Sequence, residues 1–318
     1  MRAVTLPLEP PLLPQLARSA PELPDGDGWV FERKWDGFRA IAFVDGDELQ
    51  LQSRNGRPLV RYFPELRFPP GRYVLDGELV IRNRAGGEEF DALQERIHPA
   101  ASRVAMLAER TPARFVAFDL LAHDDRSLLE LPFWERREAL EGMIAEPLEL
   151  AAATTDRDAA AGWLRDTEGV IAKRVDSPYL PGKREGMVKI KRVRTIDCVA
   201  VGWRPGKAKG TVGSIILGLY DDDDDEPAVV GHTSGFTAAR ARELVDILAP
   251  YESGEHGTGA PSRWSADREL EWRALRPELV VEVSFDHRSG RRIRHGAKLL
   301  RLREDRDPRS CRIDQLDS

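Results

Sequence analysis

Short runs in which apolar and polar residues alternate recur through most of this 318-residue chain. Residues 29–34, 39–44 and 48–53 are three such runs, and the pair Asp45–Gly46 separates the last two. Alternation with a period of two indicates strands that bury one face, and Asp-Gly is a turn sequence that joins antiparallel neighbours. The pattern therefore predicts antiparallel sheets, which limits the chain to folds built from sheet layers.

Longer apolar and helix-like stretches extend this pattern up to about residue 192. Residues 73–81 and 114–121 are almost continuously apolar, as strands buried on both faces are. Further strands are expected at 169–174 and 187–192, and helices at 90–109 (interrupted by Pro99), 133–144 and 158–166. We expect a mixed α+β domain spanning residues 1–192.

A second domain is expected at residues 193–318. Three strand-like runs come first, a helical pattern follows at 237–249, and two more strands complete the set. Five strands with a helix between the third and the fourth is the order of an OB-fold β-barrel. The Gly/Ser/Pro-rich residues 251–268 are expected to be a loop, and the acidic run Asp221–Glu226 a solvated hairpin tip.

The charge is distributed unevenly, although the net charge is −6. Residues 183–210 hold nine Lys/Arg against two acids, and residues 288–312 hold ten against three. Segregated basic stretches are expected where a phosphate backbone binds, although each could also be a solvated basic face. The chain has only two cysteines and no apolar run of about 18 residues, which argues for a cytosolic protein without membrane spans.

Lysine is rare in this chain, and its positions are informative. Only 8 of the 48 basic residues are lysine, and Lys34 precedes the next one, Lys173, by 139 positions. Arginine can replace lysine as a phosphate-binding charge, but it does not give up its proton and cannot serve as an amine nucleophile. A lysine retained in such a chain is a candidate for amine chemistry.

Lys34 begins a K-x-D-G-x-R motif after a predicted strand. Lys34 and Asp36 lie two residues apart and can address one pocket, while Gly37 permits a turn or a close approach. A surface hairpin in which Lys34 merely pairs with Asp36 is the alternative. Other short motifs, at 76–79, 118–120, 168–174 and 189–191, add carboxylates, an aromatic ring and three more lysines. Carboxylates beside several lysines would suit Mg²⁺ and a polyphosphate together.

The ordered set of motifs resembles motifs I to VI of the covalent nucleotidyltransferases. It consists of ERKWDGFR, SRNG, LDGELV, AFDLL, EGVIAKR, VKIKR and LLRLREDRDP. This superfamily includes ATP-dependent DNA ligases, RNA ligases and mRNA capping enzymes, and the chain looks most like the bacterial ligase C and ligase D branch. The resemblance implies an α+β fold, with an ATP-grasp-like adenylation (nucleotidyltransferase) domain of antiparallel sheets followed by a C-terminal OB-fold barrel. It also implies a minimal enzyme of these two domains.

The resemblance also assigns roles to individual residues. Lys34 would attack ATP and carry AMP covalently. The adenine, ribose and phosphates would be held by Glu32, Arg39, Arg54, Glu78, Phe118, Glu168, Lys173, Lys189 and Lys191. The metal, Mg²⁺ or Mn²⁺, would be held by Asp36, Glu78 and Glu168. The last motif, with Arg301, Arg303, Asp305 and Arg306, would orient pyrophosphate in the first step and then move away.

Two positions depart from the family pattern. Asp305–Arg306 stands where the last motif usually reads Asp-Lys, which keeps the charge but changes its geometry. Met187 stands where many ligases have an aromatic residue. Neither change removes a charged group from the expected site.

The expected partner is nicked duplex DNA, bound through its backbone, and the expected setting is the cytoplasm and nucleoid of a bacterium, with a role in DNA repair. We expect a monomer. Three alternatives stay open from the motifs. A capping-type guanylyltransferase would prefer GTP, and an RNA ligase would prefer broken RNA. A DNA-end-binding module would have lost catalysis altogether.

Overall fold

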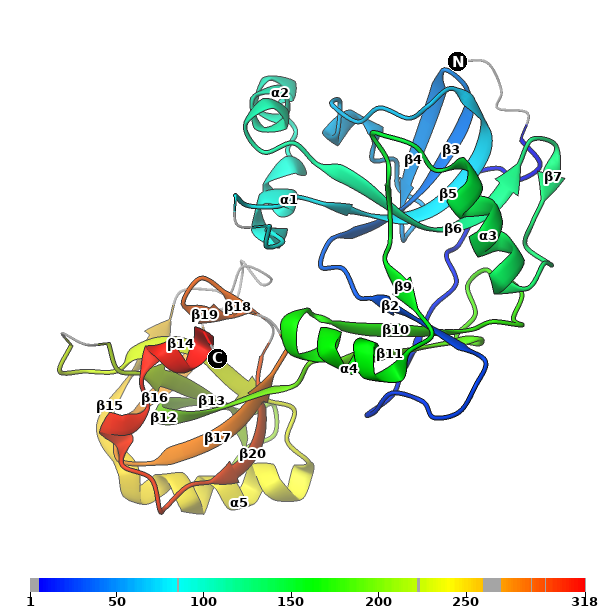
Figure 1. The fold of residues 1–318 in the computed structure, drawn as a ribbon. Helices are drawn as coiled ribbons and strands as arrows, with labels where there is room; N and C mark the ends of the chain where they lie inside the picture. Colours follow the sequence, from blue (N-terminus) through cyan, green and yellow to red (C-terminus); the bar gives the residue numbers. More distant parts are fainter. Residues whose placement is uncertain are drawn as a thin grey trace. The chain divides into compact units, whose positions relative to one another are not determined.

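The computed structural model describes residues 6–84, 86–221, 224–259, 270–286, 288–294 and 296–317. The chain forms two compact units, Met1–Arg192 and Val193–Ser318 (Figure 1). None of the helices in the described part of the chain has the length and apolar character needed to cross a membrane.

A five-stranded sheet carries one half of the first unit. Its strands, in spatial order, are β1 (Arg18–Ser19), β11 (Met187–Lys191), β10 (Gly169–Arg174), β2 (Trp29–Arg33) and β9 (Ala153–Thr154). Helix α4 (Arg157–Asp166) lies along one face of this sheet, where Val170, Ala172 and Ile190 pack against it (Figure 1). Because side chains alternate along a strand, Glu32, Ile171 and Lys189 share the opposite face, where the register places them side by side.

A six-stranded sheet carries the other half of this unit. It contains β4 (Glu48–Ser53), β3 (Phe38–Gly46), β5 (Gly71–Val80), β6 (Arg114–His123) and β7 (Arg126–Ser127) in this order, with β8 (Glu149–Leu150) beside β6. The helical elements of this half are η1 (Val60–Tyr62), α1 (Phe90–Arg96), α2 (Ala101–Arg110) and α3 (Phe133–Met143). The helix expected at 90–109 is thus two helices separated around Pro99, as that proline predicts.

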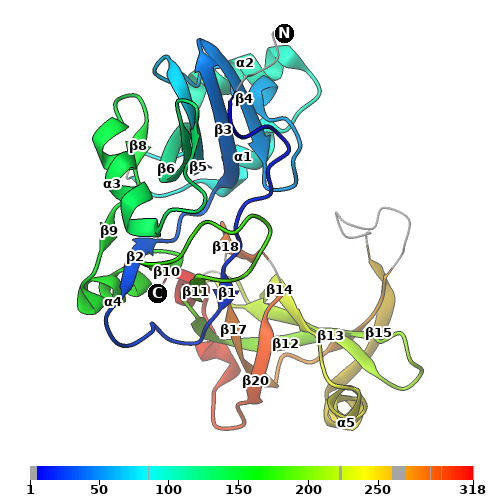
Figure 2. The same cartoon turned by 90° about the vertical axis from the view of Figure 1, so that its right-hand side faces the viewer.

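Different elements pack on the two faces of the six-stranded sheet. Ala40, Ala42 and other residues of one face pack against Leu93 of α1 and Leu140 of α3, and Figure 2 shows α3 beside β6. On the opposite face, Ile41 packs with the N-terminal segment. Arg39 points to this second face two residues before Ile41, which places it in the candidate site.

The second unit is built around five strands and one helix. The strands are β12 (Arg194–Pro205), β13 (Val212–Leu219), β14 (Ala228–Ser234), β17 (Val280–Phe285) and β20 (Lys298–Leu302), and α5 (Ala238–Leu248) follows the third of them. The ladder runs β14-β13-β12-β17-β20, and a parallel bridge between Thr233 and Ala297 links its outer strands. This is the strand order expected of an OB-fold, although the sheet stays open apart from that bridge.

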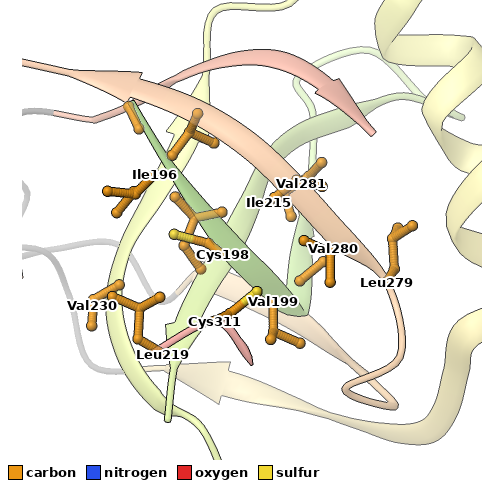
Figure 3. Packing of buried hydrophobic residues seen from close by; sticks show 14 of the residues in the cluster. Ile196, Cys198, Val199, Ile215, Leu219, Val230, Leu279, Val280, Val281 and Cys311 are labelled. Atoms are coloured by element: carbon orange, nitrogen blue, oxygen red, sulfur yellow. The ribbon is translucent and has the colours of Figure 1, made fainter. Parts of the chain in front are cut away.

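Figure 3 shows the core of this unit, in which Cys198 of β12 and Cys311 lie among aliphatic side chains such as Val199 and Val281. Both cysteines are free and buried. The remaining short elements are η2 (Ala249–Tyr251), β18 (Arg288–Ser289), β19 (Arg292–Ile293), η3 (Pro308–Ser310) and η4 (Ile313–Asp317).

The prediction of a loop at residues 251–268 is wrong for the first part of that range. Strands β15 (Glu252–Gly259) and β16 (Leu270–Leu275) pair with each other, and β16 extends the sheet beside Gly202 and Trp203 of β12. Backbone hydrogen bonds to β16, which is itself paired with β12, hold a Gly-rich segment that has no apolar alternation of its own. The residues 260–269 lie outside the described part of the chain, as do residues 222 and 223 of the expected acidic hairpin tip.

Candidate active site

A cavity of about 250 Å³ in the first unit is lined by residues of both sheets. Nine residues expected at the site line it: Glu32, Lys34, Asp36, Arg39, Arg54, Glu78, Phe118, Lys173 and Lys189. Lys191 and Glu168 belong to the same unit but are not among the lining residues. The structure therefore brings most of the short sequence motifs of the first unit together around one hollow.

The loop that carries Lys34 is fixed by its backbone. The Lys34 amide donates a hydrogen bond of 2.9 Å to the Gly169 carbonyl, which ties the loop to the five-stranded sheet. On the other side, a Cβ at Gly37 would lie 2.1 Å from the Leu79 carbonyl oxygen of β5. Only glycine permits this approach, which explains why the motif needs glycine three residues after the lysine.

Four cations near the cavity have no ion-pair partner within the described residues. Lys34, Arg54 and Lys189 line the cavity, and Arg184 lies close enough to act on Lys189. Burial lowers the pKa of Lys189, and the charges of Lys191, Arg54, Arg184 and Lys34 lower it further. An uncompensated positive cluster of this kind favours a polyanion. The sequence analysis did not identify Arg184, because nothing in its local pattern distinguishes it from other arginines of the basic stretch.

Another cation of the cavity lining, Arg39, is neutralised by the protein. Arg39 forms a bidentate pair with Asp76, with Nε–Oδ1 and Nη2–Oδ2 distances of 3.0 and 2.6 Å. The Tyr179 hydroxyl donates to the same carboxylate at 2.6 Å. Asp76 is fully buried, so this network fixes the Arg39 guanidinium rigidly. Asp76 and Tyr179 are therefore positioning residues; the sequence motifs included Asp76 without giving it this role and did not include Tyr179.

Lys173 pairs with Glu32 inside the cavity wall. Burial raises the pKa of Glu32, and the charges of Lys173 and Arg137 oppose that rise. The second carboxylate oxygen of Glu32, Oε1, is buried without a hydrogen-bond partner within the described residues. A buried acceptor of this kind is suited to an amino group of a ligand.

A β-bulge aims Phe118 into the cavity. Asp76 pairs with Asp119, but the next pair joins Gly77 to Ala117, so Phe118 is the extra residue of β6. Bulges re-aim side chains next to functional sites. The ring lies 5.3 Å from the Arg39 guanidinium and 4.8 Å from the Lys173 ammonium. It can stack on a planar base, as the sequence motif suggests.

Glu78 is a buried carboxyl group in the lining of the cavity. Burial raises its pKa to about 8, against the opposing charges of Arg39 and Lys34. Asp36 lies in the same lining. No group of three or more His, Cys, Asp or Glu residues in the described part of the chain is arranged to hold a metal by itself. The predicted metal ligands Asp36, Glu78 and Glu168 therefore do not form such a group without a ligand, and Mg²⁺ commonly uses one or two carboxylates together with substrate phosphates and water.

The residues of the last motif lie in the second unit, within a network of ion pairs. Arg301 pairs with Glu282 at 2.6 Å, and Arg306 pairs with Asp197 at 3.3 Å. Arg303 reaches Asp197 as well, and its hydrogen bonds to Asp305 lower the pKa of that carboxyl to about 2. Asp197 and Glu282 are opposite each other on β12 and β17. Sequence reasoning did not identify this acidic pair, because it depends on strand register.

The chemistry of the cavity fits ATP. The ring of Phe118 and the Glu32 oxygen that accepts no hydrogen bond suit a base with an amino group, and the cations that have no ion-pair partner among the described residues suit a triphosphate. A triphosphate also supplies the oxygen ligands that a divalent cation needs beside Glu78.

Comparison with known proteins agrees with this fit. The family model described as "ATP dependent DNA ligase domain" matches residues 13–191, and that described as "ATP dependent DNA ligase C terminal region" matches residues 208–306. DNA ligase C1 of Mycolicibacterium smegmatis is 48% identical over 335 residues, which cover 98% of this chain and 96% of that protein. DNA ligase C of Mycobacterium tuberculosis is 44% identical over 98% of this chain and 95% of its own length.

Among solved structures, a mycobacterial DNA ligase D in complex with ATP and MES has a TM-score of 0.54 and 31% identity, covering 93% of this chain and 96% of that one. These matches are to DNA ligases rather than to capping enzymes or RNA ligases, the enzyme classes that the motifs alone left open. The chain belongs to the ATP-dependent DNA ligase family.

Proposed function

We propose that this ligase seals nicks in duplex DNA and that Lys34 is the residue that becomes adenylated. The observation that carries the proposal is the position of Lys34 in the cavity lining together with Arg54 and Lys189, which likewise have no ion-pair partner within the described residues. The solved relative that binds ATP supports the choice of nucleotide.

In the first step, the Lys34 amine gives up its proton to water and attacks the α-phosphorus of ATP. A P–N bond forms, the bond to the β-phosphate oxygen breaks, and pyrophosphate leaves. In the second step, the 5′-phosphate of the nick attacks the lysyl-AMP, and the amine leaves. In the third, the 3′-hydroxyl attacks the adenylated phosphate, AMP leaves and the strand is closed. Each step is an in-line transfer, so positioning and charge stabilisation supply most of the catalysis.

Side chains of the cavity have distinct roles in this scheme. Phe118 stacks on adenine, and the Glu32 carboxylate accepts a hydrogen bond from the adenine amino group. Arg39, held by Asp76, contacts the ribose and the α-phosphate. Lys189, together with Lys191, stabilises the charge that develops on the phosphate. A divalent cation, Mg²⁺ or Mn²⁺, would neutralise further phosphate charge beside Glu78, Glu168 and Asp36.

The DNA is bound through its phosphates. Arg54 at the mouth of the cavity binds the 5′-phosphate of the nick, and the basic residues 204–210 of the second unit bind the duplex backbone. Arg301, Asp305 and Arg306 act in the first step, when pyrophosphate leaves. The protein works as a monomer in the bacterial cytoplasm, on nucleoid DNA, and serves DNA repair.

A labelling experiment tests the proposal. The wild type, Lys34→Ala and Lys34→Arg are incubated with α-labelled ATP and Mg²⁺, and nicked DNA is then added. We expect labelled wild-type protein whose label passes to DNA, and no label on either variant, because arginine keeps the charge but supplies no nucleophile. Labelled Lys34→Arg would assign the adenylation to another residue. Labelling of the wild type by GTP in place of ATP would refute the proposed nucleotide.

A further inference from the structure

The carboxylate of Glu88 contacts both sides of the Lys34 loop. Its Oε2 accepts a hydrogen bond of 3.0 Å from the amide of Asp36, two residues after Lys34. Its Oε1 pairs with the Arg33 guanidinium, one residue before Lys34. The Glu88 side chain is only 6% exposed, so water competes weakly for these contacts. One carboxylate, 54 positions away in the sequence, thus connects the residues that flank the nucleophile.

Glu88 is itself held in place by backbone pairing. Glu88 and Arg82 form an antiparallel bridge after the end of β5, and the Glu89 amide donates to the Ile81 carbonyl at 2.8 Å. The carboxylate therefore projects from a segment that is hydrogen-bonded to the backbone next to the end of β5, and not from a free loop. Its contacts with Arg33 and the Asp36 amide therefore restrain the Lys34 loop.

A second set of contacts supports the same loop through Trp35. The guanidinium groups of Arg33 and Arg82 lie 4.3 and 5.1 Å from the Trp35 ring centroid. Arg82 is in turn held by a bidentate pair with Glu149, at 3.0 and 2.7 Å. Residues 33, 35 and 36 are therefore engaged through a side chain or an amide, and Lys34 through its amide, while the Lys34 side chain remains available to a substrate.

We propose that Glu88 is a positioning residue that holds the Lys34 loop so that the amine meets the α-phosphorus in line. The proposal rests on the proposed role of Lys34. Lysine has a flexible four-carbon side chain, so its reach is only as precise as the backbone that carries it. Besides the Gly169 contact and the contacts of Trp35, the Glu88 carboxylate holds the loop between Lys34 and Gly37 through the Asp36 amide. An error of about 1 Å at a reacting atom can cost about 100-fold in rate.

The test separates lysine adenylation from the final sealing step. Full-length wild type, Glu88→Ala, Glu88→Gln and the matched control Glu89→Ala are compared; Glu89 is the exposed neighbour of Glu88. Three quantities are measured: the single-turnover rate of lysyl-AMP formation at saturating ATP, the ATP concentration for half-maximal rate, and the sealing of a pre-adenylated nick. In that last reaction Lys34 forms no bond, so its exact position matters little.

For Glu88→Ala we expect adenylation to slow by about 10- to 100-fold, with the half-maximal ATP concentration and pre-adenylated sealing within about threefold of the wild type. Glu88→Gln should be intermediate, because its amide oxygen can still accept the Asp36 hydrogen bond but loses the charge that pairs with Arg33. Glu89→Ala should match the wild type in all three measurements.

Two results would overturn the proposal. Adenylation by Glu88→Ala at the wild-type rate would show that the loop keeps its position without the carboxylate. An equal loss in adenylation and in pre-adenylated sealing, repeated in the milder Glu88→Gln, would show that Glu88 only supports the fold. If the wild type forms no lysyl-AMP, the proposed function fails first and the positioning role fails with it.

Discussion

The ammonium of Lys173 lies 2.8 Å from Glu32 Oε2, and both side chains are almost fully buried. The same ammonium donates to the Phe118 carbonyl at 3.1 Å. The charge of Lys173 is thus compensated by Glu32 in the cavity wall beside the Phe118 ring. Lys34 and Lys189 have no ion-pair partner within the described residues, so their charges can interact with a ligand. This distinction between lysines supports the proposed roles, with Lys173 beside the base and the other two beside the phosphates.

Removal of Lys173 should destabilise the first unit. Lys173→Met leaves Glu32 buried with only Arg137, whose Nη1 lies 3.6 Å from Oε1. Breaking a buried pair from one side costs about 3 kcal/mol or more, because the remaining charge is not compensated. Urea unfolding should show this loss of free energy of unfolding, and the double variant Lys173→Met/Glu32→Gln should recover part of it.

The exposed ion pair between Arg174 and Asp176, at the end of β10, provides a matched control for this prediction. Asp176 accepts from Arg174 at 3.2 Å in an exposed position, so Asp176→Asn should leave the free energy of unfolding near its wild-type value. If Lys173→Met unfolds at the same urea concentration as Asp176→Asn, the Lys173–Glu32 pair does not contribute to the free energy of unfolding as its burial suggests.

The sequence was informative where chemistry depends on short spacing. Lys34, Asp36 and Gly37 form one loop, and the alternation of side chains along β11 places Lys189 on the cavity face. Such local patterns also predicted the helices and the OB-type strand order, because each is determined by residues a few positions apart.

Other features of the site depend on contacts that no local pattern encodes. Asp76 meets Tyr179 across 103 positions, and Glu88 meets Arg33 across 55. In a chain with 40 arginines, sequence spacing does not tell which arginine meets which carboxylate, because strand register decides it. The hairpin of β15 and β16 was missed for a related reason, since its backbone pairing leaves no trace in side-chain periodicity.

Glu78 should make the stability of the apo-protein depend on pH. Its pKa is about 8 in the fold against an ordinary 4.5. Between these values the folded protein holds a proton that the unfolded chain releases, so the contribution of Glu78 to stability falls as pH rises from 4.5 to about 8 and levels off above that. We expect the free energy of unfolding to fall more between pH 6 and pH 9 in the wild type than in Glu78→Gln, measured with a chelator present. Parallel pH profiles for the two proteins would contradict this assignment.

Arg184 should contribute to the salt dependence of nick binding. It is exposed, has no ion-pair partner in the described part of the chain and acts on Lys189. Each phosphate contact that is removed lowers the slope of log K against log salt by about one. Fluorescence titration of nicked DNA at several salt concentrations should show this reduction for Arg184→Ala. Arg110→Ala, an exposed arginine at the end of α2, is the control, and an unchanged slope for Arg184→Ala would remove Arg184 from the DNA contact.

Asp197 should affect the first step more than the last. It pairs with Arg303 and Arg306, and its backbone is held by hydrogen bonds of 3.2 and 3.3 Å with the Gln315 side chain. If the arginines of the last motif orient pyrophosphate, Asp197→Asn should release them and slow lysyl-AMP formation by about tenfold, while sealing of a pre-adenylated nick persists. Asp246→Asn, an exposed change on α5, should alter neither reaction. Because the partly buried pairs also support the fold, thermal unfolding of both variants is measured in parallel. An equal loss in both reactions by Asp197→Asn, at an unchanged melting temperature, would show that these arginines are needed beyond the first step.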